Sequence, residues 1–340
     1  MKKIVECVPN FSEGRNSATI GAIAAAIDGT SGVKLMGVEP DIDYNRTVVT
    51  FAGQPDAVVQ AAVEATRMAL KLIDMSVHQG EHPRLGAVDV VPFVPIAGVS
   101  MQDCVDLAKR YSRQVAEEFR IPVYLYEYAA ASPERRNLAD IRKGEYEGLP
   151  EKLRNPNWRP DFGPAEFNRR SGAVVAGARK FLIAYNVNLD TPKVEIAKEI
   201  SERIRESGRL LRDETGKPKK DPQGEILRIP GSLKALKAMG VFLERVQIAQ
   251  VSINLTDFEI TPPHRAFEEV SQEAIALGCR ATGSEIVGLT PLKALLMAGE
   301  YYAAGEPLPE QGLLQLAIRR LGLSQLDPFD PCRKVIEYQL

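Results

Sequence analysis

The chain has 340 residues, of which 44% are hydrophobic, a formal net charge of -2, and four cysteines at positions 7, 104, 279 and 332. This length predicts two domains or one doubled domain, and the near-neutral charge argues against a nucleic-acid partner. The scattered cysteines exclude a zinc ribbon or a disulfide framework, and we expect neither a signal peptide nor a spanning helix of about 20 apolar residues. The sequence therefore predicts a cytoplasmic protein without a membrane partner.

Apolar patterns in the first half of the chain predict alternating strands and helices. Strands are expected at residues 3–9, 33–38, 47–51 and 88–96, and helices at residues 18–27 and 54–73. Their order, β-α-β-β-α-β, is that of the split βαβ or ferredoxin-like unit. A helix at 101–119 and a strand at 121–126 extend it, and the proline-rich segment 133–164 is expected to be a long irregular connection.

The same order of elements restarts near residue 180. Strands are expected at residues 180–189, 232–239, 247–255 and 285–288, and helices at residues 191–207, 262–277 and 291–298. Thr191 and Pro192 are expected to cap and open the first of these helices, and residues 213–225 to form a charged loop. The repeated order predicts an α+β fold with two ferredoxin-like βαββαβ subdomains, residues 1–180 and 181–340, flanking a ligand-binding cleft.

Two of the three histidines lie in residues 78–82 (HQGEH), which match the H-x-x-E-H zinc-binding pattern of inverted zincins. Such a site needs both histidines on one face of a helix. Gly80 between them and Pro83 directly after them disfavour a helix. The only other histidine is His264, and no cysteine pair is near. The segment is therefore predicted to be a loop, and no metal site is expected.

His82 lies in this loop between Glu81 and Arg84, and Asp89 follows near the start of the next strand. A histidine beside a carboxylate can be poised near neutral pH, which suits proton transfer. The alternative is an ordinary surface loop that happens to hold two histidines. The charged neighbours favour a catalytic role for His82, whereas His78 has no assigned role.

Several long strings in this sequence resemble the glutamate formimidoyltransferase family. They are VECVPNFSEGRN (5–16), NRTVVTFAG (45–53), GEHPRLGAVDVVPFVPI (80–96), GARKFLIAYNVNL (177–189) and QVSINLTDFE (250–259). The likeness covers nearly the whole chain. It implies transfer of a formimidoyl group from N-formimidoyl-L-glutamate to the co-substrate tetrahydrofolate, giving 5-formimidoyltetrahydrofolate and L-glutamate in histidine degradation. The mammalian module is fused to a cyclodeaminase, and here we expect the free-standing form.

The resemblance also implies a homodimer, a folate-binding cleft between the subdomains, and His82 as the catalytic acid/base. Two segments are expected to contact folate. They are Gly163, Pro164, Ala165, Glu166, Phe167, Asn168, Arg169, Arg170, Ser171 and Gly172, and Gly231, Ser232, Leu233, Lys234, Ala235, Leu236, Lys237, Ala238 and Met239. The first lacks the tryptophan of the mammalian domain and carries Arg169 and Arg170 instead. These two arginines either meet the glutamate tail of folate or are solvated.

The implied chemistry is a direct transfer without a covalent enzyme intermediate. One imidazole with a pKa near the working pH can take the proton from the attacking nitrogen and protonate the leaving one, for about 100- to 10,000-fold in rate. The donor carries two carboxylates, for which arginine is the preferred partner. Arg46 and Arg84, each in a matched string, are the candidates. The alternative for each is an ion pair with a structural carboxylate.

Acidic residues crowd the loop that precedes the second matched string. Glu39, Asp41 and Asp43 either hold the donor amidinium or orient His82, or they form a solvated acidic loop. Asn10 follows the first predicted strand, where its amide either binds substrate or forms a turn. Each of these interpretations stays open at the level of the sequence.

Three other functions compete with formimidoyl transfer. The same scaffold can move a formyl group from N-formylglutamate to tetrahydrofolate, as a glutamate N-formyltransferase, and the strings do not separate the two donors. A non-catalytic folate-binding protein is disfavoured by the intact G-E-H-P-R string, because binding alone needs no proton shuttle. A zinc hydrolase is the least supported. The two transferases and the folate-binding protein would all bind small molecules and would need no metal, whereas the hydrolase would need zinc.

Overall fold

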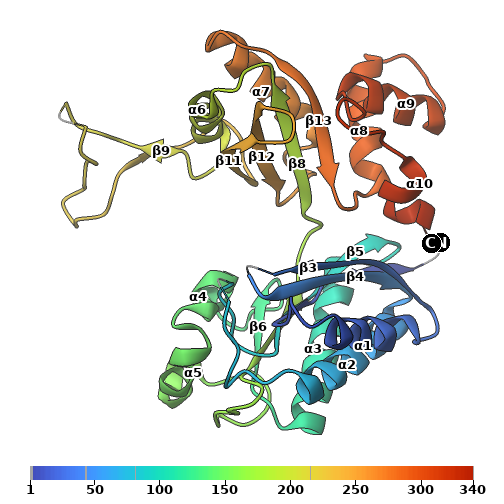
Figure 1. Cartoon of the computed structure of the whole chain (residues 1–340), viewed down its shortest axis with the longest axis vertical. Helices are drawn as coiled ribbons and strands as arrows, with labels where there is room; N and C mark the ends of the chain where they lie inside the picture. Colours follow the sequence, from blue (N-terminus) through green and yellow to red (C-terminus); the bar gives the residue numbers. More distant parts are fainter. Residues whose placement is uncertain (1–2, 43, 81, 215, 340) are drawn as a thin grey trace. The chain divides into compact units, whose positions relative to one another are not determined.

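A computed structural model of the chain describes residues 3–42, 44–80, 82–214 and 216–339. The chain divides into two compact units, with the boundary in the sequence between Lys180 and Phe181. Each unit is built around one main β-sheet with helices packed on it (Figure 1). Within the described ranges, every helix is either too short or too polar to cross a membrane. The α+β class and the two-subdomain arrangement are thereby confirmed.

The first unit contains a mixed seven-stranded sheet. Its strands are β1 (Ile4–Cys7), β2 (Asn10–Phe11), β3 (Val33–Asp41), β4 (Arg46–Gly53), β5 (Val88–Ala97), β6 (Val123–Glu127) and β7 (Val174–Ala178). β3, β4, β1 and β5 lie side by side in that order, and all their pairings are antiparallel. Together with α1 (Ser17–Asp28) and α2 (Pro55–Leu72) they complete the predicted ferredoxin-like unit. β7 and β6 extend the sheet beyond β5 in parallel.

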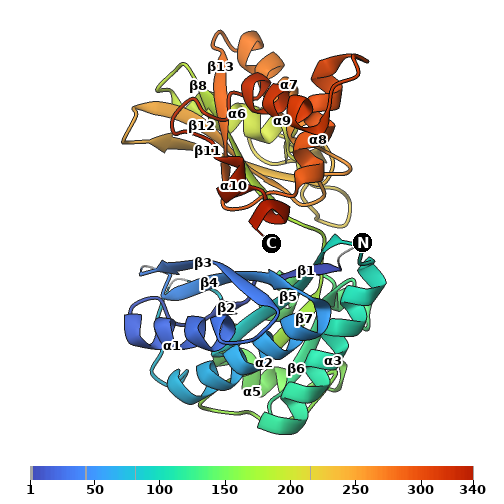
Figure 2. The same ribbon diagram turned by 90° about the vertical axis from the view of Figure 1, so that its right-hand side faces the viewer.

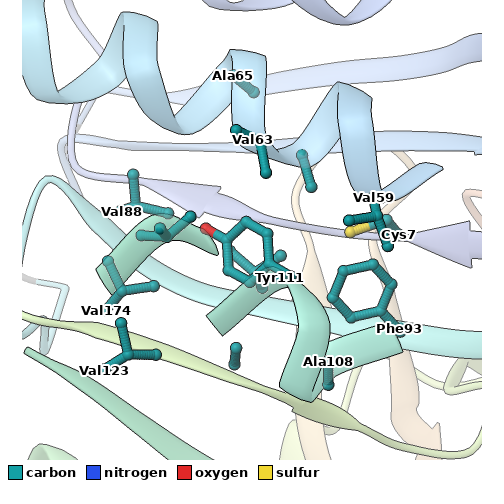
Figure 3. Packing of buried hydrophobic residues seen from close by; sticks show 14 of the residues in the cluster. Cys7, Val59, Val63, Ala65, Val88, Phe93, Ala108, Tyr111, Val123 and Val174 are labelled. Atoms are coloured by element: carbon teal, nitrogen blue, oxygen red, sulfur yellow. The ribbon is translucent and has the colours of Figure 1, made fainter. Parts of the chain in front are cut away.

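Three helices cover one face of this sheet: α1, α2 and α3 (Met101–Phe119) (Figure 2). The bounds of α3 confirm the prediction, because a capping box of Ser100 and Asp103 fixes its first turn. The main core lies between these helices and the sheet (Figure 3). The Phe93 and Tyr111 rings pack there with centroids 5.8 Å apart.

The opposite face of the sheet is covered in part by the segment that was expected to be irregular. It contains η1 (Pro133–Arg135), α4 (Leu138–Arg142), α5 (Glu145–Arg154) and η2 (Pro156–Trp158). The prediction was wrong here, because Ile141, Leu149 and Leu153 bury apolar surface against Tyr124 and Val175 and form a second core. This cover brings the charged residues of α4 and α5 toward the candidate site.

The second unit repeats the topology of the first. Its main elements are β8 (Ile183–Leu189), α6 (Val194–Ile204), β11 (Leu236–Leu243), β12 (Ile248–Leu255), α7 (Pro263–Ala276) and β13 (Ala281–Val287). The sheet order β11-β12-β8-β13, antiparallel throughout, is again ferredoxin-like. The predicted doubling is thus confirmed.

Several predicted bounds in this unit were wrong for local reasons. α6 begins at Val194, and the Thr191 hydroxyl accepts a hydrogen bond from the Lys193 amide (3.2 Å) in a turn that precedes the helix. The strand expected at 232–239 begins only at Leu236, because residue Ala235 adopts a left-handed conformation (φ 51°) in a turn. Residues 285–288 are the end of the longer strand β13.

The rest of the second unit is an arm and a helical C-terminal region. β9 (Arg209–Leu210) and β10 (Arg228–Ile229) pair at the base of an arm that carries the charged loop, and Figure 1 shows this arm standing away from the sheet of its unit. The C-terminal region contains α8 (Leu292–Ala303), α9 (Glu310–Arg320), α10 (Pro331–Lys334) and η3 (Ile336–Gln339). Of these helices, only α8 was predicted.

Candidate functional site

Four of the predicted donor-binding residues, Asn10, Glu39, Asp41 and Arg46, lie on one face of the first sheet. The strand register places Asn10 and Glu39 on either side of Val48, and Asp41 opposite Arg46. Cross-strand partners project to the same side, and the alternate residues of these strands point into the core under the helices. The four side chains therefore share the face opposite α1, α2 and α3.

Arg46 is held on this face by neutral groups. Its Nη1 donates to Oδ1 of Asn10 at 2.9 Å, and its guanidinium lies 5.9 Å from the centre of the Tyr44 ring. Asp41 accepts a hydrogen bond from the Tyr44 amide at 3.0 Å, and Glu39 is exposed. Among the described residues no carboxylate forms an ion pair with Arg46, so its charge is available to an anionic ligand. The acidic candidate Asp43 lies outside the described residues.

The described residues 78–80 and 82–86, here called the histidine loop, are held in place by Asn45, which adopts a left-handed conformation (φ 49°). Its Oδ1 accepts from the Gly14 amide at 2.9 Å, and its Nδ2 donates to the Gln79 carbonyl at 2.8 Å. Gly80 lies so close that an added Cβ would come within 2.4 Å of the Tyr44 carbonyl oxygen. The predicted loop is confirmed, and its course depends on this close approach.

His78 supports the loop. Arg84 Nε can only donate, so it points its proton at Nδ1 of His78 (3.4 Å), and Nε2 then donates to the Asn45 carbonyl at 3.0 Å. Burial lowers the pKa of His78, which keeps the ring neutral at pH 7. His78 therefore has a structural role that the sequence did not assign.

His82 is half-buried, and its backbone amide donates to the Tyr44 carbonyl at 3.4 Å. Burial first, and then the positive charges of Arg142, Arg46 and Arg84, lower the pKa of His82 to about 4. The imidazole of the free protein is therefore neutral at pH 7 and able to accept a proton. The neighbouring Glu81 lies outside the described residues.

Arg84 is buried and pairs with two carboxylates of α5. Its Nη1 donates to Glu145 Oε2 at 2.9 Å and to Glu147 Oε2 at 2.8 Å, and its Nη2 donates to Glu147 Oε1 at 2.6 Å. Of the two interpretations of Arg84, the structure supports the ion pair with protein carboxylates. The sequence missed both partners, since they lie 61 and 63 residues away in a segment read as irregular.

A second buried ion pair lies beside the loop. Asp89 is 1% exposed, accepts from the Leu85 amide at 3.0 Å, and is bonded to Nη2 of Arg142. Burial raises the pKa of Asp89, while the Arg142 guanidinium favours the ionised form. The Nε atom of Arg142 is buried without a hydrogen-bond partner among the described residues. The sequence missed Arg142, whose link to the loop depends on the helix α4.

A cavity of about 410 Å³ opens next to the histidine loop. It is lined by His78, Gln79, Gly80, Arg84, Gly144, Glu145 and Glu147. Its size suits a small molecule, and its wall combines one guanidinium with two carboxylates. Within the described ranges, no group of three or more His, Cys, Asp or Glu side chains is arranged to hold a metal ion.

Both units of the chain match models of known protein families. Residues 4–179 match the formiminotransferase domain, N-terminal subdomain, and residues 184–340 match the formiminotransferase domain. The chain belongs to the formiminotransferase family. This confirms the resemblance drawn from the sequence strings.

The relatives differ in length from this formiminotransferase chain. Glutamate formimidoyltransferase of Streptococcus pyogenes serotype M1 is 43% identical over 89% of the chain and 94% of the relative, and that of Thermoplasma acidophilum is 42% identical over 92% and 96%. Formimidoyltransferase-cyclodeaminase of Mus musculus is 50% identical over 99% of the chain. The chain spans only 60% of the length of that relative.

The first segment expected to contact folate in this formiminotransferase, Gly163–Gly172, is joined to the histidine loop. Ala87 donates to the Ser171 carbonyl at 2.9 Å, and Ala173 donates to the Leu85 carbonyl at 3.1 Å. Gly172 (φ 69°) approaches so closely that a Cβ would lie 2.1 Å from the Leu85 carbonyl oxygen. The structure therefore joins the end of this segment to residues 85–87, which follow His82 in the chain.

Some side chains of this segment contact other residues of the protein. Arg170 pairs with Asp74 at 3.3 Å, and both side chains are well exposed, which supports the surface interpretation of this arginine. Arg169 is exposed. Phe167 packs against Tyr146 in a tilted arrangement with ring centroids 5.3 Å apart and remains 37% exposed, so this segment offers an aromatic side chain although it lacks the tryptophan of the mammalian domain.

The second expected folate segment, Gly231–Met239, belongs to the other unit of this formiminotransferase. It forms a turn in which the Ala235 amide donates to Glu206 Oε2 at 2.7 Å, followed by the start of β11. Lys234 lies 3.8 Å from the other oxygen of Glu206, and both side chains are exposed. Met239 is 60% exposed on the sheet.

Proposed function

We propose that this chain is a glutamate formimidoyltransferase, which transfers the formimidoyl group from N-formimidoyl-L-glutamate to tetrahydrofolate and releases L-glutamate. The observation that carries the proposal is a neutral, half-buried His82 beside Arg46, whose partners are uncharged. It is supported by two relatives named glutamate formimidoyltransferase, each matching this chain over most of both lengths.

His82 performs the proton transfers in this proposal. A folate nitrogen attacks the amidine carbon, and neutral His82 accepts the proton that this nitrogen loses. The tetrahedral intermediate then expels the glutamate nitrogen as the imidazolium protonates it. Such general acid–base catalysis contributes about 100- to 10,000-fold in rate. No covalent bond to the protein is needed.

Donor binding adjusts the basicity of His82. In the free protein, burial and then the neighbouring guanidinium groups disfavour the imidazolium and hold the pKa of His82 at about 4. The two carboxylates of a bound donor offset those charges, and this raises the pKa toward the working pH, where one group can act as both base and acid. Arg46, positioned by Asn10, is the proposed partner of one carboxylate.

The remaining proposals concern the other donor-binding residues, folate and the state of the enzyme. Glu39 and Asp41 project beside Arg46 and are proposed to orient the donor. Folate is proposed to contact Gly163–Gly172, which is joined to the histidine loop, and Gly231–Met239 of the other unit. We propose that the enzyme works in the cytoplasm as a homodimer on these two small molecules, without a metal. Its formal net charge of -2 does not favour binding to nucleic acid, so no nucleic-acid partner is proposed.

Steady-state assays with both donors and tetrahydrofolate test the proposal. Turnover is expected with N-formimidoyl-L-glutamate, and turnover with N-formyl-L-glutamate alone would contradict it. His82→Ala is expected to lower kcat about 100-fold or more while calorimetric folate binding survives. The matched control is His264→Gln on α7, where the ring stacks on Tyr301 at 4.5 Å and takes no part in the reaction. Unchanged turnover in His82→Ala would remove His82 from the mechanism.

A further inference from the structure

The cavity beside the histidine loop has a wall whose charge bears on the choice of donor. We propose that Glu145 and Glu147 are specificity-determining residues that favour the cationic formimidoyl group of the donor over a neutral formyl group. This inference rests on the proposed function. It adds a role for two carboxylates that no sequence pattern indicated.

The fold places both carboxylates in the cavity wall. They occupy the first turn of α5, and the cavity is also lined by Gln79 and Gly80, which precede His82 in the chain by three and two residues. Gly144 (φ 87°) and Glu145 (φ 56°) are both left-handed, a conformation that an ordinary residue such as glutamate adopts rarely. This sharp turn starts the helix where its acidic end borders the cavity.

The charges in this wall do not cancel. Glu147 forms a two-point pair with Arg84 and neutralises it, whereas Glu145 uses only Oε2 for Arg84 and adds a second negative charge. The Glu145 and Glu147 side chains are 44% and 63% exposed, against 6% for Arg84. A molecule in the cavity therefore meets two carboxylates before it meets the guanidinium, and the wall carries one excess negative charge.

The two possible donors differ in the group that would meet this wall. Both contain glutamate with two carboxylates, but N-formimidoyl-L-glutamate ends in an amidinium with N–H donors, and N-formyl-L-glutamate ends in a neutral carbonyl oxygen. Carboxylates form charge-assisted hydrogen bonds with the amidinium. They offer no proton to a carbonyl oxygen and repel its negative end, so the same wall binds one donor and disfavours the other.

The experiment compares kcat/KM for the two donors in the wild type, Glu145→Gln and Glu147→Gln. Glu145→Gln removes the excess charge and leaves the two-point pair of Glu147 with Arg84 in place. In both variants we expect the ratio of kcat/KM for the formimidoyl donor to kcat/KM for the formyl donor to fall about tenfold or more below its wild-type value. Glu151→Gln, an exposed residue of α5 outside the cavity lining, is the matched control and is expected to keep the wild-type ratio.

A purely structural role for the two carboxylates predicts a different result. Both donors would then lose activity in the same proportion and the ratio would stay at its wild-type value, which would overturn the inference while the proposed function stands. If the wild type turns over neither donor, the proposed function fails instead. Calorimetry with the two glutamate derivatives then decides the inference, because an amidinium preference lost in Glu145→Gln supports it and an unchanged preference overturns it.

Discussion

The two units of the chain share one topology and differ in the side chains that one face of the sheet carries. In the first unit this face carries Asn10, Glu39, Asp41 and Arg46, and the helices α4 and α5 add further charges. In the second unit, β8 and β12 carry a row of amide side chains, Asn186, Asn188 and Gln250, beside the carboxylate of Glu285 on β13, and Asn188 and Gln250 are buried. Gln250 donates to the Asn188 side chain at 2.7 Å.

This amide row is a closed hydrogen-bond network. Gln250 and Asn186 both donate to Glu285 Oε1, at 3.0 and 3.1 Å, and Asn188 donates to Gln325 at 2.6 Å. The histidine of this unit, His264, is instead stacked on Tyr301. A ferredoxin-like sheet therefore fixes positions and not chemistry, since in the first unit the histidine His82 lies beside the guanidinium groups of Arg46, Arg84 and Arg142, whereas this face of the second unit carries amides.

The largest difference that we expect concerns buried charge. Asp89→Ala leaves Arg142 buried and unpaired, which should destabilise the first unit by about 3–5 kcal/mol. The single tryptophan, Trp158, lies in this unit, so urea unfolding followed by its fluorescence reports the change. The control is Arg110→Ala, which breaks an exposed pair with Asp56 in the same unit and should cost at most about 1 kcal/mol. Equal effects of the two variants would show that the Asp89 pair is not effectively buried.

A smaller effect is expected in the amide row of the second unit. Gln250→Ala leaves the Asn188 oxygen without its donor and removes one of two donors to Glu285, so we expect a loss of about 1–3 kcal/mol. Hydrogen exchange of the β8 and β12 amides measures this loss. Asn254→Ala, an exposed position on the same face of β12, is the matched control. Protection that is unchanged in Gln250→Ala would mean that the network adds nothing to stability.

The smallest expected effect is a shift in titration. Burial and nearby guanidinium groups hold the pKa of His82 at about 4, below the ordinary 6.5, so removing one positive charge in Arg142→Gln should move it upward. Burial is the first cause and persists, so the return is partial. NMR titration of the three histidines measures the shift, and His264, in the other unit, serves as the internal reference. A His82 pKa that stays at about 4 would rule out an influence of Arg142.

The lowered pKa values of His82 and His264, both about 4, determine how the stability of the folded state changes with pH. As pH falls from 6.5 toward 4, unfolded chains bind a proton at His82 and at His264 that the folded units resist. The folded state therefore loses stability across this window in both units, and the loss is complete below about pH 4. Above pH 6.5 these two histidines contribute no pH dependence.

The parts of the fold that were predictable from sequence depend on local signals. The two βαββαβ orders come from apolar periodicity, the bounds of α3 from a capping box, and the loop at residues 78–82 from Gly80 and Pro83. The helices α4 and α5 were not predicted, because Gly144 and Pro150 interrupt the helical pattern of the sequence. Its burial depends on Tyr124 and Val175, which are distant in the chain and reach it only through the sheet.

For the candidate site, sequence strings indicated His82, Asn10 and Arg46, and the structure brings these within one unit. The partner of Arg84 was not predictable, because a lone arginine carries no information about which carboxylate lies near it in the fold. Arg142 and Asp89 were missed as a pair for the same reason: 53 residues separate them, and only the packing of α4 on the sheet brings them together.

The anchoring of the histidine loop by Asn45 limits how far that loop can be transplanted. Its shape depends on an amide that binds Gly14 and Gln79, on the Tyr44 carbonyl that Gly80 must approach, and on the bridge to Ser171. Grafting residues 78–86 alone onto another scaffold would transfer a sequence without its geometry. A designer who wants this histidine in a new protein must carry over residues from three distant parts of the chain, so the sequence pattern is not a portable module.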